Sequence, residues 1–187
     1  MRRLTALALT AAVLCTSGYL SAQGRVRQQG RAIVEYRSPE VTAVAAYEYS
    51  QRNHGSTWLL IEFGVQSAKR IAIHRDEISL RGPDERTVPV ATQQQFLEDH
   101  QELNRLLQNA QIWRRALDSY FVTRPKHTIR FFSRPGQVVH DSAITNLDEV
   151  AVGDLFFKSP NGRWEAGTYH LVLNHAQAKA ELPISLE

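Results

Sequence analysis

The stretch Thr57-Trp58-Leu59-Leu60-Ile61-Glu62-Phe63-Gly64-Val65 decides the fold, because its apolar residues recur at every second position. All odd-numbered positions from Leu59 to Val65 carry large apolar side chains, while Trp58, Leu60 and Glu62 fall on the opposite face. Successive side chains of a β-strand point to opposite faces. Alternation that is rich in branched and aromatic residues is typical of a strand with one buried face. The stretch therefore predicts a half-buried strand.

Further short strands are expected on both sides of this stretch. Residues 41–49 are the expected antiparallel partner, joined to it through the turn-prone sequence Asn53-His54-Gly55-Ser56. Shorter strands follow at 70–74, 77–80 and 87–90, with the turn signal Gly82-Pro83-Asp84-Glu85 before the last of them. The chain before Thr92 is thus predicted to be a meander of short strands.

From Thr92 the apolar repeat changes from two residues to about 3.6, which is typical of an amphipathic helix. Thr92 and Gln95 have the spacing of a capping box. The apolar stripe then continues over about seven turns, through Phe96, His100, Leu103, Leu107, Ala110, Trp113, Leu117 and Tyr120. Since no Gly or Pro occurs before Arg124-Pro125, we predict one long amphipathic α-helix over about 92–121, within an insertion at 92–124. A helix draws most of its stability from tertiary packing, so Leu107→Asp is expected to abolish soluble folding.

The two-residue repeat resumes after Pro125 and continues to the end of the chain. Strands are expected at 128–132, 154–157, 168–174 and 179–186, and the tight turn Ser159-Pro160-Asn161-Gly162 separates the second from the third. The pattern as a whole predicts one mainly β domain at 41–187 that holds the helical insertion. Because its strands are short and joined by turns, they are expected to pair antiparallel and to form a sandwich.

The sequence Glu165-Ala166-Gly167-Thr168-Tyr169-His170-Leu171 resembles the Asp-x-Gly-x-Tyr-x-Cys signature of immunoglobulin-like sandwiches. The resemblance covers about 161–187 and implies an immunoglobulin-like antiparallel sandwich of the bacterial, disulfide-free kind. It also implies a tyrosine corner, in which the Tyr169 hydroxyl bonds to backbone upstream. Separately, residues 58–92 are similar to exported bacterial modules of unknown role that are built on sandwich folds.

The N-terminal residues have the order of a secretory signal peptide. Arg2 and Arg3 precede an uncharged, mostly apolar run from Leu4 to Leu14, and Leu20-Ser21-Ala22 supplies a small-residue cleavage site. This run is shorter than the roughly 20 apolar residues that a membrane span needs, although an uncleaved anchor is the alternative. We therefore expect a signal peptide at 1–22, removed after Ala22, and no membrane span in the mature chain.

The mature chain would begin with a polar lead-in at 23–40, most of which is expected to be flexible, with Ala32 to Tyr36 as a candidate first strand. Cys15 is the only cysteine and leaves with the signal, so the exported protein has no disulfide, which fits a bacterial protein that is periplasmic or secreted. Removing Arg2 and Arg3 lowers Lys plus Arg from 22 to 20 against 19 Asp plus Glu, which leaves a net charge of +1. The remaining arginines are scattered among acidic residues, so the basic patch of a nucleic-acid-binding protein is missing.

We assign no catalytic, cofactor-binding or metal-binding residue, and no cofactor, from the sequence. His140-Asp141 is similar to the doublet of certain metal phosphohydrolases, but those enzymes are all-helical and this doublet is expected in a loop. His170 and His175 are an odd number of residues apart, which places them on opposite faces of a strand. No Gly-x-Ser-x-Gly elbow, phosphate-binding loop or dinucleotide-binding motif occurs.

Three functions remain open. The preferred one is a non-enzymatic envelope module that binds or scaffolds an envelope protein through its polar helix face or its free sheet edges. The second is a hydrolase or carbohydrate-active enzyme whose Asp, Glu or His residues meet only in space. The third is a carbohydrate-binding module that uses exposed aromatic residues such as Trp58, Trp164 or Phe132. A pocket with converging carboxylates would favour the second, a coplanar exposed Trp pair the third, and a flat surface the first.

Overall fold

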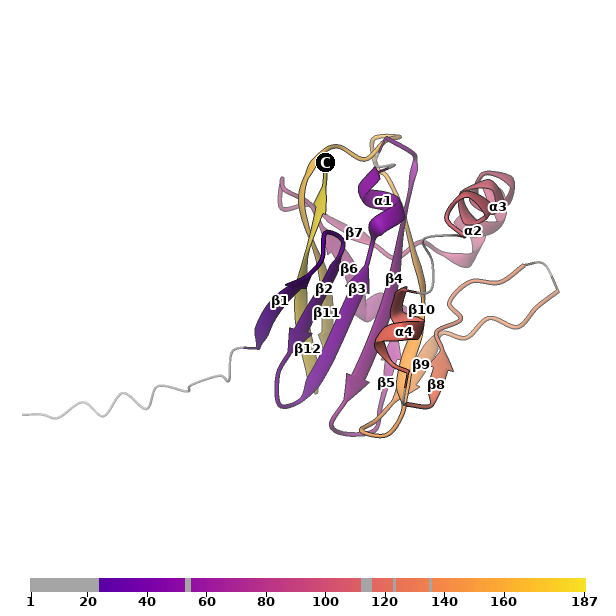
Figure 1. Cartoon of the computed structure of the whole chain (residues 1–187). Helices are drawn as coiled ribbons and strands as arrows, with labels where there is room; N and C mark the ends of the chain where they lie inside the picture. The colour runs from indigo at the N-terminus through magenta and orange to yellow at the C-terminus, as the bar shows by residue number, and fades with distance from the viewer. Residues whose placement is uncertain (1–23, 53–54, 112–115, 123, 135) are drawn as a thin grey trace, which may run out of the picture.

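The structure is a computed structural model that describes residues 24–52, 55–111, 116–122, 124–134 and 136–187. The predicted signal peptide at 1–22 and the stripe residue Trp113 lie outside the described residues. As expected, the chain is mainly β and contains several antiparallel sheets (Figure 1). None of the helices in the described ranges has both the length and the hydropathy of a membrane-spanning helix.

The larger sheet has six strands. In spatial order they are β1 (Arg25–Gln29), β2 (Ile33–Arg37), β3 (Val41–Ala46), β4 (Trp58–Ser67), β10 (Val150–Lys158) and β8 (Lys126–Thr128). Neighbouring strands are antiparallel except for β8, which runs parallel to β10. The short helix α1 (Glu48–Arg52) follows β3.

The second sheet has four antiparallel strands. Their order is β12 (Ala178–Leu186), β11 (Gly167–His175), β6 (Ile78–Arg81) and β7 (Thr87–Pro89). A separate antiparallel pair is formed by β5 (Ile71–His74) and β9 (Ser142–Thr145), and the 3₁₀-helix η1 (Arg75–Glu77) links β5 to β6.

The main hydrophobic core lies between the six-stranded and the four-stranded sheets. The inward face of β4, from Leu59 to Val65, is buried there together with Leu171 and Leu173 of β11. Strand β12 also contacts β2 and β3 across the core. The alternation of β4 is therefore explained by a two-layer packing of sheets.

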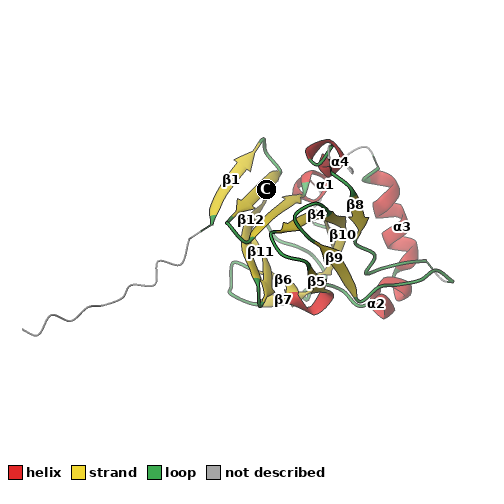
Figure 2. Cartoon of the chain, turned by 90° about the horizontal axis from the view of Figure 1, so that it is seen from below, coloured by secondary structure: helices red, strands yellow, loops and turns green. Residues whose placement is uncertain are grey.

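The outward face of β4 is buried as well, which differs from the predicted half-buried strand. Trp58 and Leu60 are only 1% and 3% exposed. They pack under α2 (Gln93–Glu98) and α3 (His100–Asn109), in a second apolar cluster that includes Phe96 and Leu103. Figure 2 shows α3 and α4 on the side of the molecule that is away from β11 and β12. The helices thus form a third layer over the six-stranded sheet.

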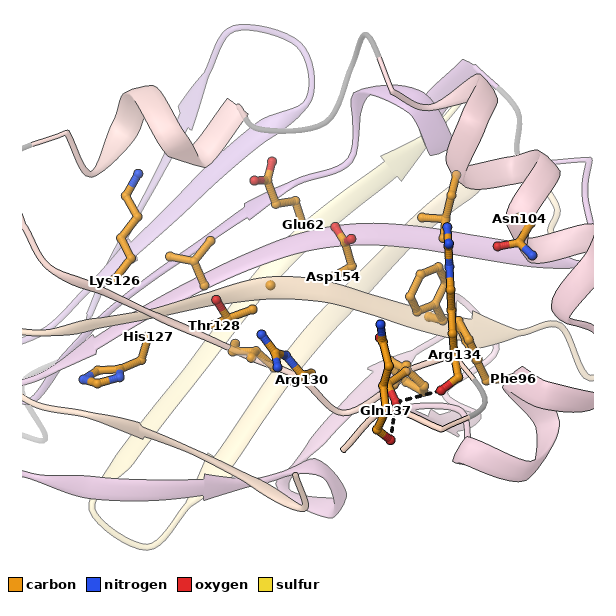
Figure 3. A pocket seen from close by; sticks show the side chains of 17 residues that line it. Glu62, Phe96, Asn104, Lys126, His127, Thr128, Arg130, Arg134, Gln137 and Asp154 are labelled. Carbon is orange, nitrogen blue, oxygen red and sulfur yellow. Dashed lines mark hydrogen bonds between the residues drawn. The ribbon is translucent and has the colours of Figure 1, made fainter. Parts of the chain in front are cut away.

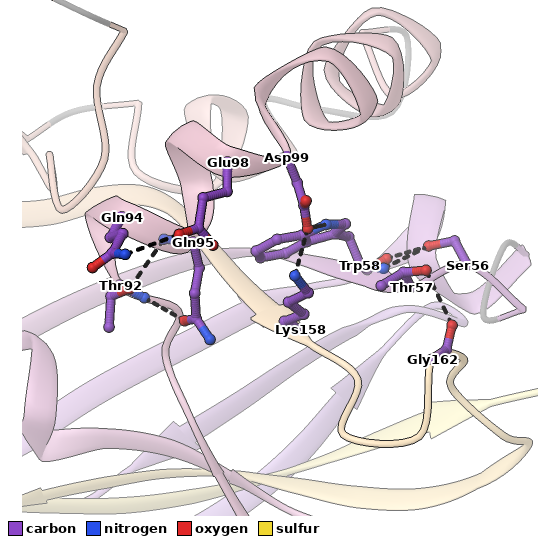
Figure 4. A network of polar contacts seen from close by, with 10 residues as sticks. All are labelled: Ser56, Thr57, Trp58, Thr92, Gln94, Gln95, Glu98, Asp99, Lys158 and Gly162. Atoms are coloured by element: carbon purple, nitrogen blue, oxygen red, sulfur yellow. Dashed lines mark hydrogen bonds and ion pairs between the residues drawn. The ribbon is translucent and has the colours of Figure 1, made fainter.

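The expected continuous helix over 92–121 is not present: the described residues of this span form α2, α3 and α4 (Ala116–Tyr120). The Thr92 capping box at the start of α2 is confirmed, with Gln95 N donating to Thr92 Oγ1 at 3.1 Å. The first break is at Asp99, whose φ and ψ of −103° and 20° lie outside the helical region. Its carboxylate accepts a hydrogen bond from Trp58 Nε1 at 3.1 Å and pairs with Lys158 Nζ at 2.7 Å (Figure 4).

Helix α4 covers a different part of the six-stranded sheet from α2 and α3. Leu117 and Phe121 pack against Val44 of β3 and Val152 of β10 in a third apolar cluster. A Cβ atom at Gly64 would lie 2.6 Å from the Phe121 ring, so this close approach needs a glycine in β4. The apolar stripe is therefore divided between two docking positions on the sheet.

The segment 23–40, most of which was expected to be a flexible lead-in, contains strand β1 as well as β2, which lies where the candidate first strand was expected. Gly30 has a φ of 65° in the turn between them, a left-handed conformation that glycine adopts without strain. Val34 of β2 is fully buried beside β3, whereas most of β1 is exposed. Sequence reasoning missed β1 because its polar residues add a sheet edge without covering the core.

The hydrogen bond expected of Tyr169 is present. Its hydroxyl donates to the carbonyl oxygen of Glu165 at 3.1 Å, and its ring lies edge-on to Trp164 with centroids 5.5 Å apart. Burial raises the pKa of the Tyr169 hydroxyl, which keeps it a hydrogen-bond donor. The bond fixes the loop that precedes β11.

The packing of the helices on the sheet predicts that replacing two leucines of α3 by alanine destabilises the protein to different extents. Leu103 is fully buried, whereas Leu107 is only partly buried and lines a cleft. Leu103→Ala is expected to lower the free energy of unfolding by about 2–5 kcal/mol, and Leu107→Ala by a smaller amount. Urea denaturation followed by tryptophan fluorescence measures both. Equal losses, or a greater loss for Leu107→Ala, would contradict this packing.

Candidate functional site

A cleft of about 440 Å³ opens on the helix-covered face of the six-stranded sheet. Its floor is formed by β4 and β10, one wall by α2 and α3, and the other wall by residues 126–134 and Gln137 (Figure 3). Figure 1 shows this second wall continuing into an orange loop beside α2 and α3. We call this cavity the outer cleft.

One end of the outer cleft is lined by three phenylalanines. Phe96 of α2 stacks on Phe132 with ring centroids 5.4 Å apart, and Phe156 of β10 lies edge-on to both, at 5.4 and 5.1 Å. The three rings come from the floor and from both walls. Aromatic pairs in such geometries add to the free energy of burial, so this cluster holds the parts of the cleft together.

Hydrogen bonds fix the loop wall to α2. The side-chain amide of Gln93 donates to Ser133 O at 2.8 Å and accepts from Ser133 N at 3.1 Å. The Ser133 hydroxyl donates to Gln137 O at 2.9 Å, and His140 N donates to Arg130 O at 2.9 Å. Because these bonds satisfy backbone groups within the loop, the wall has a defined course.

Gly153 allows the loop wall to lie directly on β10. Ile129 N donates to Val152 O at 2.7 Å. A Cβ atom at position 153 would lie 2.4 Å from the carbonyl oxygen of Ile129, which is closer than a carbon and an oxygen can approach. Only a glycine fits there without moving the backbone.

Two carboxylates lie on the floor of the outer cleft. Asp154 and Glu62 are directly paired across β10 and β4, and directly paired residues have Cβ atoms about 4.5–5.5 Å apart. Glu62 is 9% exposed, and its Oε2 accepts from Leu117 N at 3.3 Å near the start of α4. Both side chains have interaction partners in the fold, so neither is a free charge.

Basic side chains line the opposite wall. Arg130 and Arg134 are both exposed, and neither guanidinium has an ion pair within the described ranges. Figure 3 shows Arg134 rising beside the phenylalanine end and Arg130 lying near Thr128. His127 Nε2 lies 3.1 Å from Glu149 Oε1, and this hydrogen bond is the main cause of the lowered pKa of Glu149.

Of the residues considered for a function in the sequence, Phe132 lines this cleft, whereas His140, Asp141, His170, His175, Trp58 and Trp164 do not. His140-Asp141 is in a loop, as expected. His170 pairs with Glu181 at 2.9 Å, while His175 Nδ1 accepts from Gln177 N. No group of three side chains that could hold a metal ion occurs in the part of the chain that the structure describes.

The exposed tryptophans required by the carbohydrate-binding hypothesis are missing from the described residues. Trp58 and Trp164 are only 1% and 3% exposed. Their burial is explained by the layers that cover them: Trp58 lies under the helices, and Trp164 packs on Tyr169. Trp113 lies outside the described residues.

Sequence reasoning did not find the outer cleft, because its lining comes from four separate stretches of the chain. Glu62 and Asp154 meet only through the register of β4 and β10. No protein-family model matches the chain, and no curated protein or solved structure matches it either. The geometry and chemistry of the cleft are therefore the basis for its function.

Proposed function

We propose that the chain is an exported, non-enzymatic module of the bacterial envelope that binds a protein partner in the outer cleft. The observation that carries this proposal is the presence of two exposed guanidinium groups on the loop wall, those of Arg130 and Arg134, of which Arg134 lies beside the phenylalanine end of the cleft (Figure 3). Aromatic residues and arginine are enriched at the centres of protein interfaces and dominate their binding energy. The cleft combines both on a wall fixed by hydrogen bonds.

The chemistry of the lining favours a partner segment with acidic and apolar side chains. A guanidinium group forms paired hydrogen bonds with a carboxylate, so Arg130 and Arg134 suit an Asp or Glu of the partner. Val138 follows the lining residue Gln137 and is 67% exposed. It extends the apolar surface at the loop wall, which favours a protein segment over a small polar ligand.

The fold proposed for this module is an immunoglobulin-like sandwich, and the strand order supports it. The order β3-β4-β10 in one sheet and β12-β11-β6-β7 in the other corresponds to strands A-B-E and G-F-C-C′ of that fold. The hydrogen bond from Tyr169 to Glu165 also supports it. The fold carries no activity of its own, so the function rests on the cleft.

Export of the module predicts a specific N-terminal residue for the mature protein. We expect residues 1–22 to be removed after Ala22, so that the protein recovered from the periplasm or the medium begins at Gln23. Intact mass measurement and N-terminal sequencing of the native protein test this. Recovery of a chain that still begins at Met1, or its confinement to the cytoplasm, would contradict the proposed export.

A charge reversal in the cleft tests the partner proposal. The mature protein is used to capture cross-linked partners from its native envelope, beside the variant R130E/R134E and the control R105E. Arg105 is an exposed residue of α3 that does not line the cleft. The wild type and R105E are expected to capture the same protein, and R130E/R134E to capture at least about tenfold less. Equal capture by all three proteins would refute the cleft as the binding site.

A hydrolase is the second candidate, because Glu62 and Asp154 converge on the floor of the cleft. Binding without catalysis predicts no turnover of chromogenic glycosides or esters by the wild type. The variants E62Q and D154N serve as the comparison, since the amide oxygen introduced by E62Q can still accept the Leu117 N–H. Turnover by the wild type that is lost in both variants, with unchanged melting temperature, would replace the binding proposal by a hydrolytic function.

A further inference from the structure

The strand β1 forms one edge of the six-stranded sheet. Its paired neighbour is β2, and four of its five residues are exposed. Figure 2 shows β1 at the margin of the molecule, away from α2 and α3. An edge strand presents a row of backbone donors and acceptors that no neighbouring strand uses, so β1 is a candidate site for the addition of a further strand.

The hydrogen bonds of β2 determine which backbone groups of β1 point outward. Tyr47 N donates to Ala32 O at 2.9 Å, which directs the backbone groups of Ala32, just before β2, towards β3. Backbone groups of successive residues in an antiparallel sheet point to alternate sides, so the odd-numbered residues of β2, from Ile33 to Arg37, bond to β1. Their partners are the odd-numbered residues of β1, which therefore complete the ladder to β2.

Val26 and Gln28 direct their N–H and C=O groups away from β2. Ala68 N donates to Glu40 O at 2.8 Å, and counting from this bond through β3 and β2 gives the same assignment. No hydrogen bond to these four outward groups occurs in the part of the chain that the structure describes. The edge thus offers two donors and two acceptors, with the spacing that an incoming antiparallel strand requires.

The side chains on one face of this edge are basic. Arg25 and Arg27 lie on the face that carries Arg37 and Glu35, because directly paired residues share a face. Both are exposed, and neither has an ion pair within the described ranges. Glu35 is only 5% exposed, and its carboxylate pairs with Arg37 at 2.5 Å. Two guanidinium groups without an acidic partner therefore lie along β1.

The other face of the edge is apolar at Val26. This side chain is 50% exposed, and its cross-strand neighbour Tyr36 packs against the main core. An apolar side chain of an added strand, placed directly opposite Val26, would cover the exposed surface. The edge therefore suits a segment in which acidic residues, facing Arg25 and Arg27, alternate with apolar residues.

A second copy of the chain fits this edge less well than an acidic partner. The register that pairs the whole of β1 with its copy is centred on Arg27, so the two Arg27 side chains lie directly opposite each other. A shift of the centre to Val26 places Arg25 opposite Arg27, and a shift to Gln28 leaves only residues 27–29 paired. Like charges directly opposite each other are destabilising, and charged residues on an edge strand protect it from self-pairing.

We propose that β1 binds an extended segment of a partner protein, with alternating acidic and apolar side chains, as an added antiparallel strand. The apolar residues of the segment exchange backbone hydrogen bonds with Val26 and Gln28, and its acidic residues lie opposite Arg25 and Arg27. Strand addition takes its affinity from the main chain and its specificity from alternate side chains. None of these four residues lines the outer cleft, so this docking site is separate from it.

Fluorescence anisotropy with labelled peptides tests the strand addition. The probe is a short peptide of alternating Glu and Val, compared with its Lys-Val counterpart and with two N-methylated forms. Methylation of the Val nitrogens removes the N–H groups that face β1, and methylation of the Glu nitrogens removes those that point away. We expect the Lys-Val and Val-methylated peptides to bind the mature protein at least about tenfold more weakly than the other two. Equal binding of all four peptides, or equal weakening by both methylations, would overturn the proposal.

Variants of the protein locate the binding. Val26→Pro removes one outward N–H of β1 without removing a ladder bond to β2, and R25Q/R27Q removes the two cations. Each is expected to weaken binding of the Glu-Val peptide about tenfold. The control R105Q, in α3, and the cleft variant R130E/R134E are expected to bind this peptide like the wild type. Peptide binding that is lost only in R130E/R134E would refute the site.

Hydrogen exchange in the wild type gives a measurement that does not depend on substitution. Adding the Glu-Val peptide should slow exchange of the Val26 and Gln28 amides, and leave that of the Arg27 amide unchanged because it already bonds to β2. Unchanged exchange at Val26 and Gln28 would contradict strand addition. Slow exchange of both amides without peptide, together with a dimer in sedimentation, would assign the edge to a second copy instead.

Discussion

The burial of β4 on both faces is the constraint on which the rest of the structure depends. Its inward residues, from Leu59 to Val65, pack in the core between the sheets, and Trp58 and Leu60 pack under the helices. Burial contributes about 25 cal/mol per Å² of apolar surface, so both layers that cover the six-stranded sheet contribute to its stability. The outer cleft exists because the helices and the loop wall cover the far side of this sheet incompletely.

The first break in the helical insertion, at Asp99, lies at a polar contact with the sheet. A continuous helix through Asp99 would gain only a few tenths of a kcal/mol per residue from helix propensity. An unpaired N–H on buried Trp58 would cost about 1–3 kcal/mol. The second effect is larger. Asp99 keeps its helical backbone bonds, to Gln95 O at 3.2 Å and from Leu103 N at 3.0 Å, while its carboxylate bonds to Trp58 and Lys158. Beyond this break, α3 lies along the outer cleft and forms part of its wall.

The sequence predicted features that depend on near neighbours, such as the alternation of β4, the Thr92 capping box and the bond from Tyr169 to Glu165. It did not predict features that depend on distant residues. The stripe from Phe96 to Tyr120 looked continuous because the partners of Asp99 are far away in the chain. The pairing of Glu62 with Asp154 on the floor of the cleft was not predictable either, because it depends on the register between β4 and β10. Strand β1 consists mostly of polar residues, so its sequence shows no apolar alternation that would indicate a strand.

Contact between two backbones, rather than between side chains, sets the position of the loop wall. Gly153 allows the carbonyl group of Ile129 to lie close to β10, and the Gln93 side chain forms hydrogen bonds with the backbone N–H and C=O of Ser133. The side chains of Arg130 and Arg134 take no part in these contacts. The proposed binding function thus assigns selectivity and architecture to different residues. Replacement of the two arginines is therefore expected to change the chemistry of the wall without altering its course.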